Sequence, residues 1–278
     1  MDRVVQKREQ VSIVSGALSV LRVFIGSVAL AGLFAVGAVA SPIEVVIVDA
    51  GHGDDDIGAI GPNGSQEKDV VLGLAKEFGK KLEEAGIRVI YTRNDDSFVS
   101  LAERAEVANM TKDADLFISL HANASQDATV RGPETYFLSQ EASDEEAREV
   151  ARAENDFGRL RSAEDAGPEL GALLASMMQT RYLEDSRDVA MAIQLELEKL
   201  PGKSRGVKQA PFVVLSNVNM PAVLVEVGFL TNRDEERELR RSSHRARIVS
   251  AIVRAIKSTA LAGEKRPGRE EPQVSEGR

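Results

Sequence analysis

The chain contains no cysteine and no tryptophan, and only three of its 278 residues are histidine. Without cysteine it can form no disulfide, bind no metal through thiolate and use no thiol nucleophile. Any metal must therefore be bound by histidine and carboxylate side chains. Because histidine is so rare, the positions of His52, His121 and His244 are informative about function.

The chain also has no excess of positive charge. It carries 35 Lys and Arg against 44 Asp and Glu, a formal net charge of -9. A nucleic-acid partner is excluded on this ground, since a phosphate backbone requires clustered basic residues. A chain of this length with 43% hydrophobic residues can bury one sizeable core. We expect a single folded domain that acts as a monomer.

The first forty residues have the pattern of an export signal. An apolar run covers residues 23–39 and ends in the small residues Ala38-Val39-Ala40, after four basic residues: Arg3, Lys7, Arg8 and Arg22. This order is typical of a signal peptide cleaved after Ala40, which predicts a periplasmic protein. An uncleaved membrane anchor is the alternative interpretation, because the run is near the lower length limit for a span.

Short β-branched runs alternate with amphipathic segments along the rest of the chain. Strands are expected at 43–48, 87–91, 116–120, 133–138, 212–215 and 222–226, and helices at 69–85, 101–110, 170–178, 189–200 and 234–261. This alternation predicts an α/β fold: a single domain over 43–262 with a mainly parallel or mixed sheet of about six strands and helices on both faces. The charged residues 143–167 are expected to form a helical insertion. The tail 263–278 is expected to be disordered.

Polar side chains follow several of these strands. His52 comes after the first strand, His121 directly follows the third, and Glu226 ends the last. Ligands bind outside the carboxyl ends of strands in open α/β sheets, so these side chains are expected at one edge. Glu67 stands at the start of the first helix, after a loop (residues 53–66) that is long enough to fold back over that edge. Zinc suits this set, since three histidine or carboxylate ligands leave a fourth position open.

Each of these residues also has a structural interpretation. A lone histidine is more often structural than a ligand, and we interpret His244, among arginines, in that way. Glu67 can simply favour the dipole of a first helical turn. The aspartates 54–56 are interpreted as a solvated loop tip rather than a second cation site. From position alone, therefore, the metal site is one of two open interpretations.

Three groups of motifs favour the metal site over the structural interpretation. They are Val48-Asp49-Ala50-Gly51-His52-Gly53 with Glu67-Lys68-Asp69, Ser119-Leu120-His121-Ala122-Asn123-Ala124, and Pro221-Ala222-Val223-Leu224-Val225-Glu226-Val227-Gly228-Phe229. In this order, from about residue 45 to 261, the chain resembles the zinc-dependent N-acetylmuramoyl-L-alanine amidases of the amidase_3 family. The resemblance implies that peptidoglycan is the substrate and that the bond between N-acetylmuramic acid and L-alanine is hydrolysed.

The resemblance also implies roles for individual residues. His52, Glu67 and His121 match the residues that bind one Zn²⁺ ion, and Glu226 matches the catalytic glutamate. Asn123, just after a ligand, is interpreted either as a residue that orients substrate or a ligand, or as a turn residue. Two other functions stay open: another zinc peptidase of wall peptides, and a non-catalytic protein that binds peptidoglycan or an activator. The four intact site residues favour an enzyme.

The insertion suggests regulation. Helical spacing places Glu154 on one face with four apolar residues: Ala147, Val150, Ala151 and Phe157. The chain resembles a subset of the family that acts in cell division, in which a helix of such an insertion blocks the zinc site until an activator with a LytM-type domain relieves it. The resemblance implies that residues 143–167 plug the site, with Glu154 at the fourth zinc position. The alternative is a boundary glutamate on a solvated helix.

Overall fold

The computed structural model describes residues 41–162 and 170–261. The export signal expected in residues 1–40, the tail expected in residues 263–278 and the end of the insertion lie outside these ranges. Across the described ranges, no helix combines the length and the apolar character needed to cross a bilayer.

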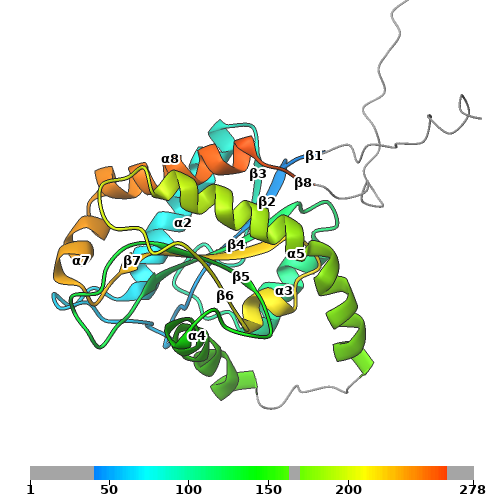
Figure 1. Ribbon diagram of the computed structural model, residues 1–278, viewed down its shortest axis with the longest axis horizontal. Coiled ribbons are helices and arrows are strands. Elements are labelled where there is room, and N and C mark those ends of the chain that lie inside the picture. The colour runs from blue at the N-terminus through cyan, green and yellow to red at the C-terminus, as the bar shows by residue number, and fades with distance from the viewer. Residues whose placement is uncertain (1–40, 163–169, 262–278) are drawn as a thin grey trace, which may run out of the picture. The chain divides into compact units, whose positions relative to one another are not determined.

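The core of the fold is a six-stranded mixed sheet with strand order β3-β2-β4-β7-β5-β6 (Figure 1). Its strands are β2 (Val45–Ala50), β3 (Arg88–Tyr91), β4 (Leu116–Asn123), β5 (Glu134–Leu138), β6 (Val207–Ala210) and β7 (Ala222–Phe229). The first four in the order are mutually parallel, whereas β5 runs antiparallel to β7 and parallel to β6. Separately, β1 (Ser41–Pro42) pairs with β8 (Ala260–Leu261). The predicted fold class is confirmed.

Helices cover both faces of this sheet (Figure 1). One face packs against α2 (Glu67–Glu84), α5 (Leu170–Leu197) and α8 (Ser242–Ser258), and the other against α3 (Leu101–Met110), α4 (Glu145–Ser162) and α6 (Val213–Ser216). The short helix α7 (Arg233–Leu239) follows β7. Because side chains alternate along a strand, Val46 and Val48 of β2 enter one core while Val45 and Ile47 enter the other.

One predicted strand is wrong. Three of the residues at 212–215 belong to the helix α6 (Val213–Ser216), with Phe212 as its N-cap, and the edge strand beside β5 is β6 instead. Periodicity cannot separate a short buried helix from a buried strand, and Val214 and Leu215 are buried in either case. Pro211, which has no N–H to donate to a ladder, separates the two elements.

Two helix boundaries also differ from expectation. The helices predicted at 170–178 and 189–200 are one continuous helix, α5, because no glycine or proline interrupts residues 172–197. The helix predicted at 234–261 is two, α7 and α8, with a break at Arg240 and Arg241.

Candidate metal centre and active site

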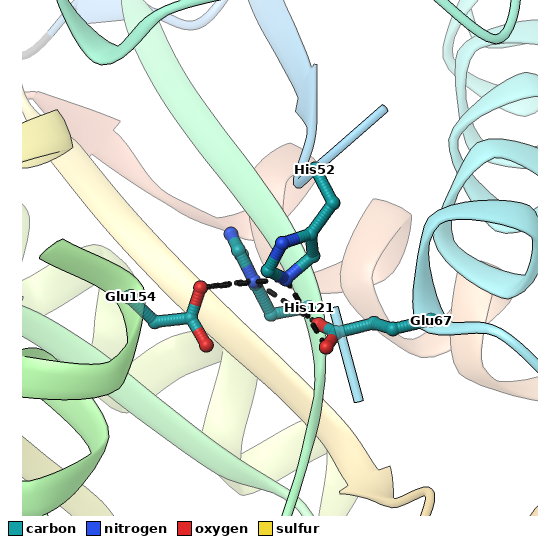
Figure 2. A group of neighbouring side chains, drawn as sticks. All are labelled: His52, Glu67, His121 and Glu154. Carbon is teal, nitrogen blue, oxygen red and sulfur yellow. Dashed lines mark hydrogen bonds and ion pairs between the residues drawn. The ribbon is translucent and has the colours of Figure 1, made fainter. Parts of the chain in front are cut away.

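Four side chains, from the loop after β2 and from α2, β4 and α4, converge at the carboxyl end of the sheet, as Figure 2 shows. One nitrogen or oxygen of each of His52, Glu67, His121 and Glu154 lies within 4.8 Å of the others. His52 Nε2 is 3.1 Å from Glu67 Oε2, and His121 Nδ1 is 3.2 Å from Glu67 Oε1. Ligand atoms about 2.0–2.2 Å from a tetrahedral ion lie roughly 3.4 Å apart. These separations therefore fit a small divalent metal.

His52 stands just beyond β2 in a strained backbone conformation. Its φ of 62° is in the left-handed region, which costs a non-glycine residue free energy. Arg104 Nη2 donates to the carbonyl of His52 (2.8 Å), and Arg93 Nη2 donates to that of Gly51 (2.6 Å). The two buried arginines therefore hold the turn in place. The imidazole Nδ1 lies 2.9 Å from Asp56 Oδ1, an arrangement that directs Nε2 toward the cluster.

Sequence reasoning missed the partners of this turn. Asp56, interpreted as solvated, instead orients His52. Arg104 forms a buried ion pair of 2.7 Å with Asp49, whose carboxylate also accepts hydrogen bonds from Thr92 and Ser119. Burial raises the pKa of Asp49, but Arg104 and the two hydroxyls outweigh it and lower the pKa. A sequence signal did exist, since Asp49 interrupts an otherwise apolar buried strand.

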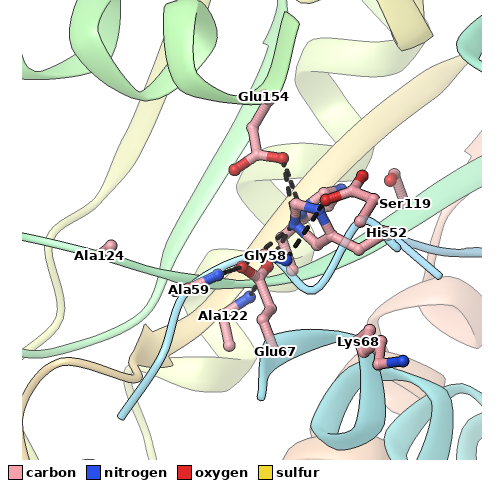
Figure 3. Close-up of polar contacts among 12 residues, drawn as sticks. His52, Gly58, Ala59, Glu67, Lys68, Ser119, Ala122, Ala124 and Glu154 are labelled. Carbon is pink, nitrogen blue, oxygen red and sulfur yellow. Dashed lines mark hydrogen bonds and ion pairs between the residues drawn. The ribbon is translucent and has the colours of Figure 1, made fainter. Parts of the chain in front are cut away.

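Glu67, the first residue of α2, has both carboxylate oxygens fixed by backbone groups. The N–H of Ala59 donates to Oε2 and that of Ala122 donates to Oε1, each over 2.9 Å (Figure 3). Gly58 is required beside it, because its φ is +63° and a Cβ there would lie 2.6 Å from Glu67 Oε2. Burial raises the pKa of Glu67, but His52 and His121 lower it well below its ordinary value, so the group is a carboxylate.

His121 lies near the end of β4 with its ring against the turn after β2. A Cβ on Gly51 would lie 2.3 Å from the ring, so glycine is needed for this close approach. His121 Nδ1 faces Glu67 at 3.2 Å and Glu154 at 3.0 Å. The rings of His52 and His121 stand edge to face, with centroids 4.9 Å apart. Both ligand nitrogens therefore point to one place.

The electrostatics of the cluster favour a cation. Burial lowers the pKa of His52, but the carboxylates of Glu67 and Glu154 outweigh it and raise the pKa to about 10. The same two carboxylates overcome burial at His121 and raise its pKa well above 6.5. In the absence of metal, protons supply the positive charge, and a divalent ion can replace them. His244, as expected, lies outside the cluster, in α8 beside Glu238 and Arg247.

Glu226 is next to the cluster on the neighbouring strand. It pairs in register with His121 and is fully buried. Neither of its carboxylate oxygens has a hydrogen-bond partner in the described part of the chain. Burial raises its pKa well above the ordinary value; His121 opposes this shift, and Glu154 and Glu67 add to it. Such a group is suited to proton transfer.

Asn123 lies outside the donor cluster and contacts strand β5. Its Nδ2 donates to Glu134 Oε2 (3.3 Å), and its Oδ1 accepts from the N–H of Ala124 (2.7 Å). Glu134 in turn lies opposite Glu226 in the β5–β7 register. The role of Glu134 was not predicted from the sequence, because the sequence does not reveal which residues contact an acid in a strand.

Helix α4 lies across the site. A cleft of about 750 Å³ is lined by Glu67, Asn123 and Glu154, and a small cavity of about 20 Å³ lies beyond Glu154, between α4 and residues 98–101. Ala147, Val150 and Ala151 of α4 are buried, as the helical spacing predicted. The side chain of Phe157 lies outside the described part of the helix.

We expect Glu236 to be a main support of the loop that leads to Glu67. The buried carboxylate accepts from the N–H groups of Asn63 and Ser65 and from Asn63 Nδ2, at 2.6–3.1 Å. Glu236→Ala should lower the free energy of unfolding by about 3 kcal/mol, measured by urea denaturation at pH 7, because these donors lose a charged acceptor. Glu238→Ala on the same helix, which removes surface ion pairs with Arg241 and Arg247, should have little effect.

The effect of this substitution should depend on pH. Burial raises the pKa of Glu236, but hydrogen bonds from Ser65 and Asn63 hold it below 4.5. A depressed folded-state pKa stabilises the protein above pH 4.5, and the gain is lost as pH falls through the folded value. The difference between parent and variant should therefore shrink below pH 4.5. A constant difference would contradict the assigned role of the carboxylate.

Comparison with known proteins agrees with this geometry. Residues 46–258 match the family model Amidase_3, described as N-acetylmuramoyl-L-alanine amidase. The chain is 37% identical to the amidase AmiA of Escherichia coli (strain K12), over 77% of this chain and 75% of AmiA. It is 36% identical to AmiC of Neisseria meningitidis over 78% of this chain, but it spans only 54% of AmiC.

Solved structures show the same fold. An N-acetylmuramoyl-L-alanine amidase from Clostridium difficile 630 superposes with a TM-score of 0.58 and 28% identity, covering 78% of this chain and 96% of that one. The CwlD amidase of Clostridioides difficile, solved in complex with the GerS lipoprotein, has a TM-score of 0.58 and 25% identity, covering 77% and 96%. The chain belongs to the Amidase_3 family and is an N-acetylmuramoyl-L-alanine amidase.

Proposed function

We propose that the amidase is zinc-dependent and that His52, Glu67 and His121 hold the ion. The observation that carries this proposal is the convergence of three fixed donor atoms beside the buried carboxylate of Glu226. Two imidazoles and one carboxylate form a common ligand set of catalytic zinc, with one position left for the reaction. Zinc there supplies Lewis-acid polarisation of the substrate carbonyl and acidifies water to a pKa of about 7.

Residues of the chain transfer the proton and hold the ligands in place. Glu226 takes a proton from the attacking water as the oxygen adds to the lactyl carbonyl carbon of N-acetylmuramic acid. As the C–N bond breaks, Glu226 returns that proton to the amino group of L-alanine. Asp56, Arg93 and Arg104 keep His52 in position, and the N–H groups of Ala59 and Ala122 fix Glu67.

We further propose that α4 is autoinhibitory. Glu154 Oε2 lies 3.0 Å from His121 Nδ1 and 3.5 Å from His52 Nε2, which is the place of a fourth ligand. Asn155 fixes the helix by donating to the carbonyl of Pro211 and accepting from the N–H of Val213. A carboxylate held there competes with water and substrate.

Release of α4 requires a partner. We propose an activator with a LytM-type domain in the periplasm, after export through residues 1–40, and a role in daughter-cell separation. The likeness of the insertion to that of cell-division amidases supports this proposal. A related amidase has been solved in complex with a lipoprotein, which supports binding of a partner protein by this fold.

Digestion of purified sacculi tests the reaction. Zinc-loaded protein is expected to release peptides with a new amino-terminal L-alanine, to stop when a chelator is added and to resume with zinc. New carboxyl termini within the stem peptide would instead identify a peptidase. Binding without release of any product, by the parent chain and by Glu154→Ala alike, would identify a non-catalytic protein.

Zinc binding should release two protons at pH 7. The pKa of His52 is about 10 and that of His121 is also raised, so both are protonated in the metal-free protein and must lose a proton to bind zinc. Affinity should therefore rise with pH by up to about 100-fold per unit below the lower of the two values. Calorimetry in buffers of different ionisation enthalpy measures the number of protons released per zinc ion bound. Release of fewer than two protons would contradict the assignment of both imidazoles as ligands.

A further inference from the structure

A charged cluster joins the first half of α4 to the sheet. Arg205 Nε donates to Glu134, and Arg205 Nη2 donates to both oxygens of Glu146, over 2.5 Å to Oε1. Lys208 Nζ lies 3.1 Å from both Glu134 Oε1 and Glu146 Oε2, and 3.5 Å from Asp144. Arg205, in the loop before β6, and Lys208, in β6, therefore share two principal carboxylates, Glu134 and Glu146.

These two carboxylates differ in how firmly they are held. Glu134 belongs to β5, is fully buried and also accepts from Tyr136 and Asn123, so it remains with the sheet. Glu146 belongs to α4, and its side chain is 37% exposed. Relief of the proposed autoinhibition requires α4 to move away from the site. Arg205 and Lys208 then share a single carboxylate, that of Glu134. One positive charge is then uncompensated, and Arg205 Nη2 loses its acceptor.

The cluster reaches the cleft that holds the metal site through Glu146, behind which Arg205 and Lys208 lie. Glu146 lines this cleft together with His52, Glu67 and Glu154. Glu146 precedes Glu154 by eight residues on one helix, which corresponds to roughly 12 Å along its axis. An extended peptide spans about 3.3–3.6 Å per residue, so this distance corresponds to three or four residues from the scissile bond.

We propose that Arg205 and Lys208 form a binding site for a carboxylate of the wall peptide, three or four residues from the scissile bond, and that Glu146 occupies this site at rest. A guanidinium and an ammonium that already hold a carboxylate in the required geometry can accept another one in its place. Glu146 is thus a mimic of the substrate group as well as an anchor of α4. This inference rests on the proposed function of α4.

Two synthetic muramoyl tripeptides test the site, one ending in a carboxylate and the other in a carboxamide. Binding is measured by calorimetry to the zinc-loaded full chain carrying Glu226→Gln, so that turnover is not needed. Adding Glu146→Gln loosens α4 for both peptides, but it should tighten binding of the carboxylate peptide about tenfold more than binding of the carboxamide peptide. Adding Lys208→Gln to that chain should abolish the preference, whereas Lys208→Arg, which retains the charge, should keep it.

The possible failures are separable. Equal effects of Glu146→Gln on both peptides would overturn the carboxylate site and leave Glu146 as an anchor of α4 only. A preference that survives Lys208→Gln, in protein with an unchanged circular dichroism spectrum, would also overturn it. Failure of the amidase assignment would instead appear as no hydrolysis of either peptide by the zinc-loaded Glu154→Ala chain, in which Glu146, Arg205 and Lys208 are intact.

Discussion

Glu226→Gln is expected to lower kcat about 10³-fold while zinc stays bound at one ion per chain. Loss of a general base that also returns the proton typically costs between 10² and 10⁴ in rate. Gln has nearly the same shape as Glu, and Glu226 is outside the four-residue donor cluster. The measurement is turnover of a muramoyl peptide together with the zinc content of the same preparation. Full turnover with zinc bound would show that Glu226 is not the base.

The same substitution should not weaken the fold. Burial raises the pKa of Glu226 in the folded protein, so the metal-free parent loses stability as pH rises above the unfolded value of 4.5. Gln cannot ionise and carries no such penalty. At pH 7 the melting temperature of the metal-free Gln variant should equal or exceed that of the parent. His121→Ala serves as the contrasting control, since it should lose activity together with zinc.

Sequence reasoning placed the candidate ligands because strand ends are visible in the chain. Residues 45–50 and 116–120 are mostly apolar runs that His52 and His121 follow, and parallel strands bring such ends to one edge. The motif resemblance then selected Glu67 from many surface acids. What fixes these ligands was less visible, because Arg104 contacts Asp49 and His52 across 55 and 52 residues of chain.

Contacts between distant charges could not be predicted from spacing. Arg205 reaches Glu134 and Glu146 across 71 and 59 residues, and Lys208 reaches Glu146 across 62. In a single sequence, these residues cannot be distinguished from charged residues exposed to solvent. The direction of β5 was equally hidden, since an antiparallel strand inside a parallel sheet has the same apolar alternation. Helical spacing, in contrast, did mark Glu154 as an acid on the apolar face of α4.

Glu154→Ala is expected to raise basal amidase activity about 10-fold to 100-fold in the absence of any activator. Removing one partner of a buried charge pair costs about 2–5 kcal/mol, and the 15% exposure of the Glu154 side chain reduces this cost. A loss of about 1.4–2.7 kcal/mol from the closed state corresponds to that increase in the open fraction. Activity should remain below its maximum, since Val150 is still buried and Asn155 still binds residues 211–213.

Glu149→Ala provides the matched control. Glu149 lies on the same helix and lines the same cleft, but it is exposed and outside the donor cluster. Its removal changes the charge of α4 equally without touching the site, so basal activity should stay within about twofold of the parent value. Equal stimulation by both substitutions would mean that α4 is held by its overall charge. Unchanged activity of the folded, zinc-loaded Glu154→Ala variant would show that this carboxylate does not restrain the enzyme.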